Sequence, residues 1–175
     1  MRLTVEQQWA EWQQQHWSNP QVIWRNGWLD NGFCFECRLC CGPQPGDEPF
    51  PMALLPTQIN KDIDSVFYMY DSTHACLDAR GCKALGKSGC TLQREQRPPA
   101  CGLFPLVLTP RGLYLYTVCP ASLFIALHEW LKFARNARTW LMQFPPEIRS
   151  HIAIYLQGSI LQERYIDLHV PVDLN

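Results

Sequence analysis

The chain has 175 residues, of which 47% are hydrophobic and 18% charged, and its formal net charge is -1. This length can bury the core of one domain of ordinary size, so we expect a single domain over residues 1–175. Because Lys and Arg are scattered and balanced by acids, the composition excludes the basic surface typical of proteins that bind nucleic acid or anionic membranes.

Residues 1–20 are rich in Gln and Trp and lack the apolar stretch and cleavage site of a secretory signal. No apolar run approaches the roughly 20 residues of a membrane span. We therefore expect a cytoplasmic protein with no membrane contact. In a reducing cytosol the nine cysteines are better candidates for metal ligands than for disulfide bonds.

The first predicted element is an amphipathic helix from Thr4 to about Trp17. Thr4 suits the N-cap position, and Asn19-Pro20 ends the pattern. The apolar side of this helix carries residues at spacings of three and four, namely Val5, Trp9 and Trp12. We expect the tryptophans near the N-terminus to cover the apolar side of the cysteine-rich region that follows.

A β-hairpin is predicted further along, where two apolar and β-branched runs flank a turn. The runs are Leu106 to Thr109 and Leu113 to Val118, around Pro110-Arg111-Gly112. Cys119 then ends the second strand. The remainder of residues 34–120 is expected to be irregular.

One long helix is predicted from Pro120 to about Phe144, where Pro145-Pro146 stops it. Its broad apolar face combines two stripes and predicts a core helix; the stripes are Leu123, Leu127, Leu131, Ala134 and Leu141, and beside them Ala126, Trp130, Phe133, Ala137, Trp140 and Phe144. A second helix is expected from Pro146 to about Gln157, with Gly158 as its end.

The fold class that these elements predict is α+β. We expect a single irregular metal-stabilised domain with flanking helices and a short β-hairpin. Its cysteine-cluster metal-binding region is residues 34–120, and its helical flanks are residues 1–33 and 121–175.

The strongest chemical signal is a CxxCxxCC motif followed by four single cysteines. Thiolates are soft ligands for zinc and for iron-sulfur clusters, so we predict that these residues bind metal: Cys34, Cys37, Cys40, Cys41, Cys82, Cys90, Cys101 and Cys119. Adjacent side chains such as Cys40 and Cys41 seldom ligate one ion. Two zinc sites, two cubane clusters, one polynuclear site, or one cluster with four spare thiols all remain open.

The spacing favours an iron-sulfur cluster over zinc. Regular zinc modules pair one Cys-x2-Cys knuckle with a second one downstream, and here the later cysteines stand singly. The triple run from Cys34 to Cys40 resembles the opening of a bacterial ferredoxin motif, and Cys119-Pro120 resembles its close, without the usual three-residue gap.

Three further residues bear on this site. Arg97 precedes Pro98-Pro99, and we expect it beside the cluster, donating hydrogen bonds to a cysteine sulfur or to backbone carbonyls of the loop entering Cys101. Cys76 is expected to be a packed small residue. Among the five dispersed histidines, His74 alone is kept as a substitute ligand, because it lies two residues before Cys76.

Taken together, the motif residues resemble the YkgJ family of CxxCxxCC proteins, over residues 34–120, about half of the chain. The matching residues are Cys34-x2-Cys37-x2-Cys40-Cys41, Gly81-Cys82, Gly89-Cys90, Arg97-Pro98-x2-Cys101-x2-Phe104-Pro105 and Cys119-Pro120. These proteins are described as zinc- or iron-chelating, and the resemblance implies that all eight cysteines bind metal. Two departures are Gly102, where many members carry Arg, and the additional Cys76.

The function expected from these residues is metal binding, with an iron-sulfur cluster in a redox or electron-transfer role and a redox or protein partner. The alternative is a zinc-organised binding module without catalysis. A further alternative is a cluster-dependent protein methyltransferase-like enzyme, since proteins resembling this one methylate flagellin lysines. The Cys-x3-Cys-x2-Cys run of radical S-adenosylmethionine enzymes is absent. Cys37-x3-Cys41 would need a further cysteine at position 44, which is Gln44.

Overall fold

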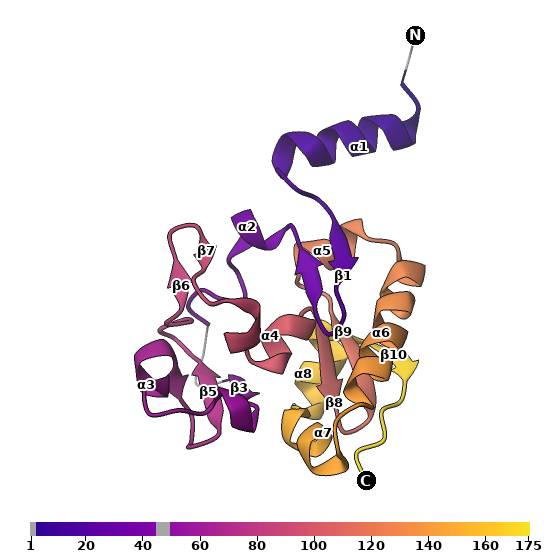
Figure 1. The fold of residues 1–175 in the computed structure, drawn as a ribbon. Coiled ribbons are helices and arrows are strands. Elements are labelled where there is room, and N and C mark those ends of the chain that lie inside the picture. Colours follow the sequence, from indigo (N-terminus) through magenta and orange to yellow (C-terminus); the bar gives the residue numbers. More distant parts are fainter. Residues whose placement is uncertain (1–2, 45–49) are drawn as a thin grey trace.

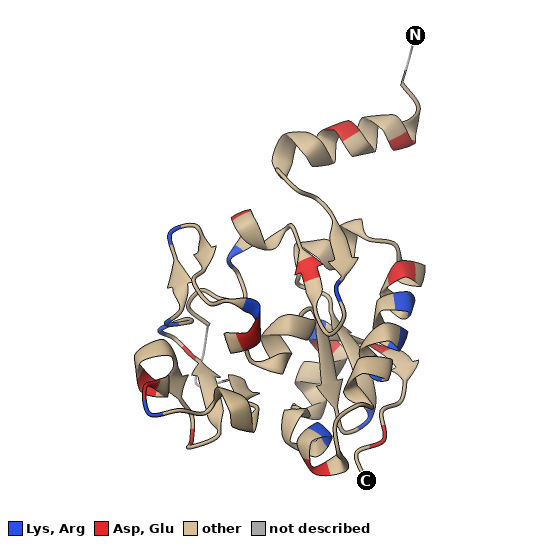
Figure 2. Cartoon of the chain, viewed as in Figure 1, with Lys and Arg blue, Asp and Glu red and all other residues tan. Residues whose placement is uncertain are grey.

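The computed structural model describes residues 3–44 and 50–175, and it mixes helices with antiparallel sheets, as the α+β prediction requires (Figure 1). Two short stretches lie outside the described residues. They are residues 1–2 in the predicted segment 1–33 and residues 45–49 in the predicted segment 34–120. Within the described part, no helix has both the length and the apolar character needed to cross a membrane. Acidic and basic residues are interspersed over the ribbon in Figure 2.

The N-terminal helix α1, Val5–His16, begins as predicted. The Thr4 hydroxyl accepts a hydrogen bond from the Gln7 amide at 3.2 Å, and the Gln7 side chain accepts one from the Thr4 amide at 2.8 Å. This reciprocal pair satisfies two of the free N–H groups at the helix start. No residue of α1 is buried, and Figure 1 shows the helix projecting from the rest of the molecule.

A three-stranded antiparallel sheet forms the base of the C-terminal half. It contains β8 (Leu106–Thr109), β9 (Gly112–Tyr116) and β10 (Tyr165–Val170) in the order β10-β9-β8. The predicted hairpin is therefore confirmed. Strand β10 was not predicted, so the flank 121–175 is not purely helical. Gly112 has φ +125°, and a Cβ there would lie 2.6 Å from the Val170 carbonyl oxygen, so only glycine fits beside β10.

The long helix predicted from Pro120 to Phe144 is wrong in one respect, because the chain forms two helices. They are α5 (Pro120–Phe124) and α6 (Leu127–Leu141), separated by extended backbone at Ile125 and Ala126. The break lets Phe124 stack on Phe33 while α6 covers the sheet with one apolar face: Trp130, Phe133, Ala134, Ala137 and Leu141. Of the other predicted stripe, Leu123 and Leu127 stay exposed.

The next prediction, a helix from Pro146 to Gln157, is also wrong at its end. Helix α7 is Pro146–Ile152, and Gly158 begins α8 (Gly158–Arg164) instead of ending a helix. The cause is an edge contact, since the Ile154 amide donates to the Leu108 carbonyl of β8 at 2.8 Å. Extended backbone along that edge buries Ala153 and Ile154.

The N-terminal half holds more regular structure than predicted. The hairpin of β1 (Val22–Trp24) and β2 (Leu29–Asn31) lies in the flank expected to be helical. The cysteine region contains two further sheets, β3-β5-β4 and β6-β7, whose strands are β3 (Phe50–Ala53), β4 (Tyr68–Met69), β5 (His74–Leu77), β6 (Leu85–Gly86) and β7 (Gly89–Cys90). Its short helices are α2 (Cys34–Cys37), α3 (Ile63–Val66), α4 (Pro99–Leu103) and the 3-10 turns Pro56–Gln58 and Arg94–Gln96.

Two hydrophobic clusters support these elements. The main core lies between the β8–β9–β10 sheet and α6, and it includes Phe33 and Cys119. The small core lies on the β3-β5-β4 sheet and consists of Met52, Leu54, Phe67, Ala75 and Leu77, with Cys82 packed against it. Cysteines of the predicted site therefore contact both clusters.

Candidate metal centre

The first cysteines of the motif lie on α2 and the turn that follows it. Cys34 and Cys37 are three residues apart on one short helix, so their side chains lie on the same side. Arg38 takes a left-handed conformation, φ 49°, which ends the helix. The Gly42 amide then donates to the Arg38 carbonyl at 2.8 Å, and this turn carries Cys40 and Cys41.

Cys119 is brought to α2 by Asn31. The buried Asn31 amide donates to the Cys119 sulfur at 3.9 Å, and its side-chain oxygen accepts from the Phe33 amide at 3.1 Å. One side chain thus ties the end of β9 to the residue before Cys34. Sequence reasoning missed Asn31, and no local pattern marked it, because its contact with Cys119 spans 88 positions.

Cys82 and Cys90 meet the motif from another side. The Cys82 amide donates to the Cys41 carbonyl at 2.8 Å. Gly81 has φ +76°, and a Cβ there would lie 2.8 Å from the Gly42 carbonyl carbon, so the two backbones pack directly together. Leu85 pairs with Cys90 across the β6–β7 hairpin, and its amide donates to the Cys82 carbonyl at 3.1 Å. Cys82 and Cys90 therefore lie at one end of that hairpin.

Cys101 enters from α4, and Arg97 lies just before that helix. The Arg97 side chain donates to the Leu92 carbonyl at 3.1 Å, which lies on the segment leading to Cys101, as predicted. The Gln58 side chain in turn donates to the Arg97 carbonyl at 2.7 Å. The charge of Arg97 also acts on the thiols of Cys34, Cys41 and Cys101, so this residue lies beside the cysteines.

The thiols share one desolvated environment. Desolvation, followed by repulsion from neighbouring thiols, raises the pKa of Cys34 to about 12 and raises the pKa of Cys101. Both residues keep surface open to solvent, yet enough protein surrounds their sulfurs for desolvation to dominate. A hydrogen bond between the adjacent thiols raises the pKa of Cys40 and lowers that of Cys41, which favours a thiolate at Cys41.

The arrangement supplies sulfur donors but not a finished coordination shell. Within residues 3–44 and 50–175, no three His, Cys, Asp or Glu side chains are grouped closely enough to hold an ion as they stand. Coordination at a metal–sulfur distance of about 2.3 Å therefore requires the thiols to turn towards common points.

Arg94 interacts with Arg97 and has a buried N–H group without a partner in the described part of the chain. Its guanidinium lies over the Trp28 ring, 4.5 Å from the centroid, and its Nη1 is buried without a hydrogen-bond partner among the described residues. Desolvation lowers the pKa of Arg94 to about 10; repulsion from Arg97 acts in the same direction, and the Glu95 carboxylate opposes both.

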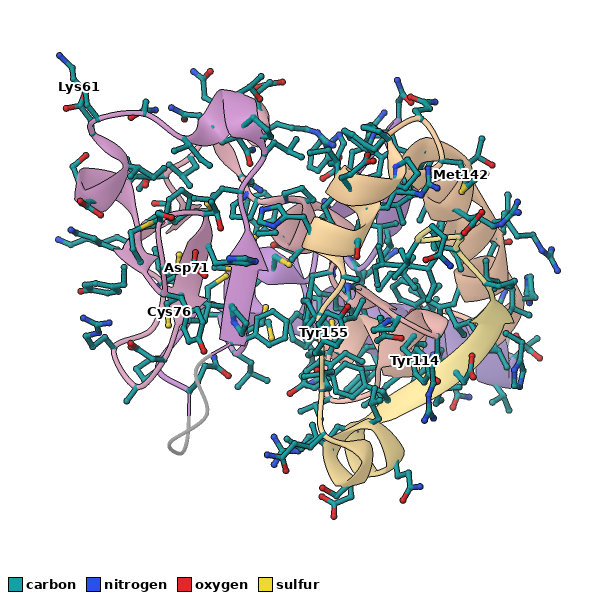
Figure 3. All side chains as sticks on the ribbon, turned by 90° about the horizontal axis from the view of Figure 1, so that it is seen from below. Lys61, Asp71, Cys76, Tyr114, Met142 and Tyr155 are labelled. Carbon is teal, nitrogen blue, oxygen red and sulfur yellow. The ribbon has the colours of Figure 1, made fainter. Side chains whose placement is uncertain are left out.

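Cys76 and His74 lie on β5, apart from this site. Cys76 is buried and pairs with Pro51 and Tyr68, and the charges acting on its thiol are those of Asp78 and Arg80. His74 bonds Asp71 at 2.9 Å and contacts the His151 ring at 4.6 Å between centroids. Figure 3 shows Cys76 and Asp71 near one another, away from Tyr114. The structure therefore confirms Cys76 as a packed residue.

We expect Cys76→Ala to leave metal content unchanged and to lower the free energy of unfolding by about 1 kcal/mol, because it removes only a small buried group. Cys37→Ala should lower the metal content per chain by removing a ligand. Metal analysis and denaturant unfolding of both variants check this. Equal metal loss in the two would make Cys76 a ligand.

Arg97→Ala should accelerate metal loss to a chelator by about 10-fold, a typical effect of removing a group that supports metal ligands. Arg97→Lys should retain the metal and change its rate of loss less. Arg80→Ala is the matched control, because Arg80 pairs with Asp78 on the surface. Unchanged metal release from the Arg97→Ala variant would remove Arg97 from the site.

Aromatic side chains join the cysteine region to α1. Trp9 and Trp12 contact Phe124 at 5.5 and 5.8 Å between ring centroids, and Phe124 stacks on Phe33 at 5.5 Å. Phe33 immediately precedes Cys34. The predicted tryptophan cover is thus only partial, since Trp9 and Trp12 remain 50% and 40% exposed. We call Trp9, Trp12, Phe124 and Phe33 the aromatic ladder.

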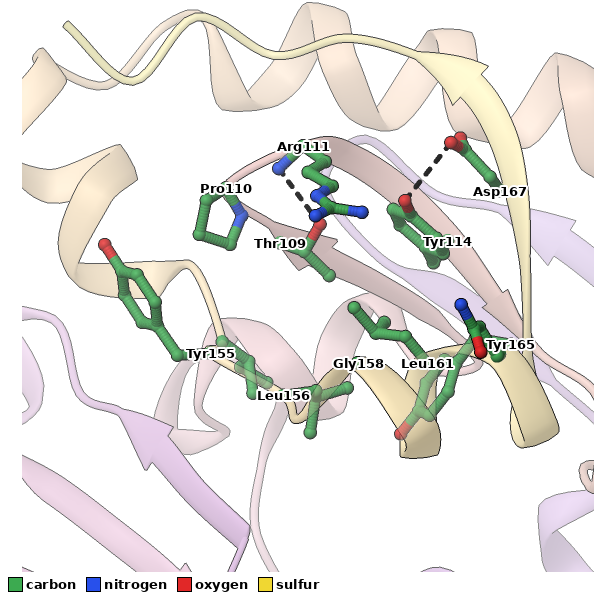
Figure 4. Close-up of a pocket in the computed structure, with 12 residues that line it drawn as sticks. Thr109, Pro110, Arg111, Tyr114, Tyr155, Leu156, Gly158, Leu161, Tyr165 and Asp167 are labelled. Carbon is green, nitrogen blue, oxygen red and sulfur yellow. Dashed lines mark hydrogen bonds between the residues drawn. The ribbon is translucent and has the colours of Figure 1, made fainter.

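A separate cavity of about 460 Å³ lies in the C-terminal half, and none of the eight cysteines lines it. The Tyr114 hydroxyl donates to Asp167 at 3.1 Å, and the Arg111 amide donates to the Thr109 hydroxyl at 3.2 Å (Figure 4). Burial and the Asp167 carboxylate raise the pKa of Tyr114, so its phenol stays protonated. This lining offers hydrogen-bond donors and acceptors.

Comparison with protein-family models, with curated proteins and with solved structures found no match. The likeness to YkgJ proteins accordingly rests on the motif residues themselves.

Proposed function

We propose that this chain is a metal-binding cysteine-cluster protein that holds iron-sulfur in a redox or electron-transfer role. The observation that carries the proposal is that thiols from distant segments lie near one another, with Arg97 beside several of them. The segments are α2 and its turn, the Gly81-Cys82 loop, β7, α4 and the residues after β9. Thiols brought together from distant segments are a soft donor set that suits zinc and iron-sulfur clusters.

The polar surroundings agree with an anionic thiolate centre. Arg97 places positive charge beside the sulfurs, and Arg94, which interacts with Arg97, has one N–H that lacks a partner among the described residues. Hydrogen-bond donors and nearby cations set the potential of such centres. The same residues would also suit a zinc tetrathiolate, so the choice of iron-sulfur rests on further features.

The aromatic ladder favours the redox role. Its rings run from the exposed Trp9 and Trp12 through Phe124 to Phe33, next to Cys34, with centroid separations of 5.4 to 5.8 Å. Contiguous aromatic rings that contain readily oxidised tryptophans suit electron movement between a surface and a buried centre. A redox partner would then contact α1.

Anaerobic purification followed by iron, zinc and acid-labile sulfide analysis tests this proposal. Iron and sulfide in comparable amounts, with visible absorption that bleaches on reduction, are expected. Stoichiometric zinc with a colourless protein would favour the zinc-organised binding module. A reduced protein that contains neither metal and takes up neither on reconstitution would refute metal binding altogether.

A further inference from the structure

The eight cysteines are not equally connected. Cys34 and Cys37 share α2, and Asn31 ties Cys119 to the residue before Cys34. The stacking of Phe33 on Phe124, at an interplanar angle of 1°, holds α2 against α5 directly after Cys119. This group is therefore anchored on the main core, to which Phe33 and Cys119 belong.

A second group is anchored on the small core. Cys82 packs against that cluster, as does Ala100 next to Cys101. The Cys101 sulfur lies 3.4 Å from the sulfur of Met52, a residue of the small core. Cys90 joins the group through its pairing with Leu85, whose amide bonds the Cys82 carbonyl.

The turn with Cys40 and Cys41 connects the groups. The Cys41 carbonyl accepts from the Cys82 amide at 2.8 Å, which joins Cys41 to the second group. Adjacent side chains such as those of Cys40 and Cys41 seldom ligate one ion, so Cys40 is assigned to the first group.

We propose that the cysteines form two separate four-sulfur metal centres, one on each hydrophobic cluster. The two centres are named by the positions of their ligands in the sequence. The outer centre consists of Cys34, Cys37, Cys40 and Cys119, and the inner centre consists of Cys41, Cys82, Cys90 and Cys101, which lie between Cys40 and Cys119. This division rests on the proposed function. It assigns the adjacent residues Cys40 and Cys41 to different centres.

Two double variants distinguish separate centres from one shared centre. Metal per chain in the anaerobically purified protein should fall twofold in Cys37→Ala and twofold in Cys82→Ala. The double variant Cys34→Ala/Cys37→Ala should keep half of the wild-type metal, because both residues serve one centre. The double variant Cys37→Ala/Cys82→Ala should lose all of it, and Cys76→Ala should match the wild type.

Complete metal loss in each single variant would overturn the division and indicate one polynuclear centre, while leaving metal binding intact. Equal retention in the two double variants would overturn it as well. A wild-type chain that binds no metal would instead refute the proposed function.

A wild-type experiment avoids variants that fail to fold. Metal-free, reduced protein is titrated with Co²⁺ under anaerobic conditions, and thiolate-to-cobalt absorption is recorded with the high-spin electron paramagnetic resonance signal. Both signals should rise in proportion up to two equivalents, since separate ions do not couple. Saturation at one equivalent, or loss of the resonance signal as the second equivalent binds, would show a single or thiolate-bridged site and overturn the division.

Discussion

Removal of metal from the reduced protein is expected to abolish its cooperative thermal unfolding. Cys119 belongs to the main core and Cys82 packs against the small core, and β6-β7 has only two residues per strand. A structural zinc site contributes on the order of 10 kcal/mol, which is comparable to the whole stability of a small domain. Without the ion, the segments that carry these cysteines lose the bonds that would join them.

The measurement is calorimetry or circular dichroism on holo protein and on chelator-treated protein kept reduced. Readdition of the same metal should restore the sharp transition, which controls for damage during chelation. An unchanged, sharp melting transition in the metal-free sample would show that the hydrophobic clusters suffice and that metal is not part of the fold.

Trp130→Ala should be the most destabilising single substitution outside the cysteines, costing about 3–5 kcal/mol. Trp130 is fully buried on α6, and its ring contacts Phe133 at 5.5 Å between centroids. The small side chain leaves a cavity under the helix that the sheet cannot fill. Urea unfolding at equilibrium gives the change in free energy.

Trp9→Ala is the matched control, because Trp9 is half exposed on a helix with no buried residue; its cost should stay below about 1 kcal/mol. Trp130→Phe separates volume from polarity, since the Trp130 Nε1 is buried without a partner among the described residues. Its cost should be smaller than that of the Ala variant. Similar costs for the Trp9 and Trp130 Ala variants would contradict the packing role of α6.

The elements that could be predicted from sequence are those specified by neighbouring residues. Thr4 and Gln7 form the capping box within one turn, and the β8–β9 hairpin is defined by Pro110-Arg111-Gly112 and its flanking apolar runs. Both depend on contacts a few positions apart, so the local pattern contains the information needed.

The elements that were missed depend on distant partners. Strand β10 exists because Tyr165 pairs with Tyr116 and Val170 with Leu113, some 50 positions away. Helix α6 is separated from α5 without any Gly or Pro, because Phe124 stacks on Phe33. For α5 and α6, tertiary packing overrides a helical pattern that is locally consistent.

The candidate site shows the same contrast between features set by neighbouring residues and features set by distant ones. The spacing of the cysteines predicted eight candidate ligands, whose binding of metal stays a prediction, and Arg97-Pro98 predicted an arginine beside them. The contributions of Asn31 and Arg94 could not be predicted, since Asn31 reaches Cys119 only after β9 and β2 have come together, and Arg94 owes its position to the Trp28 ring.

The position of Cys119 also bears on the order of events during synthesis. It is the last cysteine of the chain, and it lies buried in the main core at the end of β9. Strand β9 is paired on one side by β10, which follows it by some 50 positions along the chain. In the proposed division, the inner centre has all its ligands once Cys101 has been made, whereas the fourth sulfur of the outer centre is held in place only when β10 has docked on β9. Metal insertion at the outer centre would thus follow the synthesis of β10, and a chain terminated before β10 would retain only the inner centre.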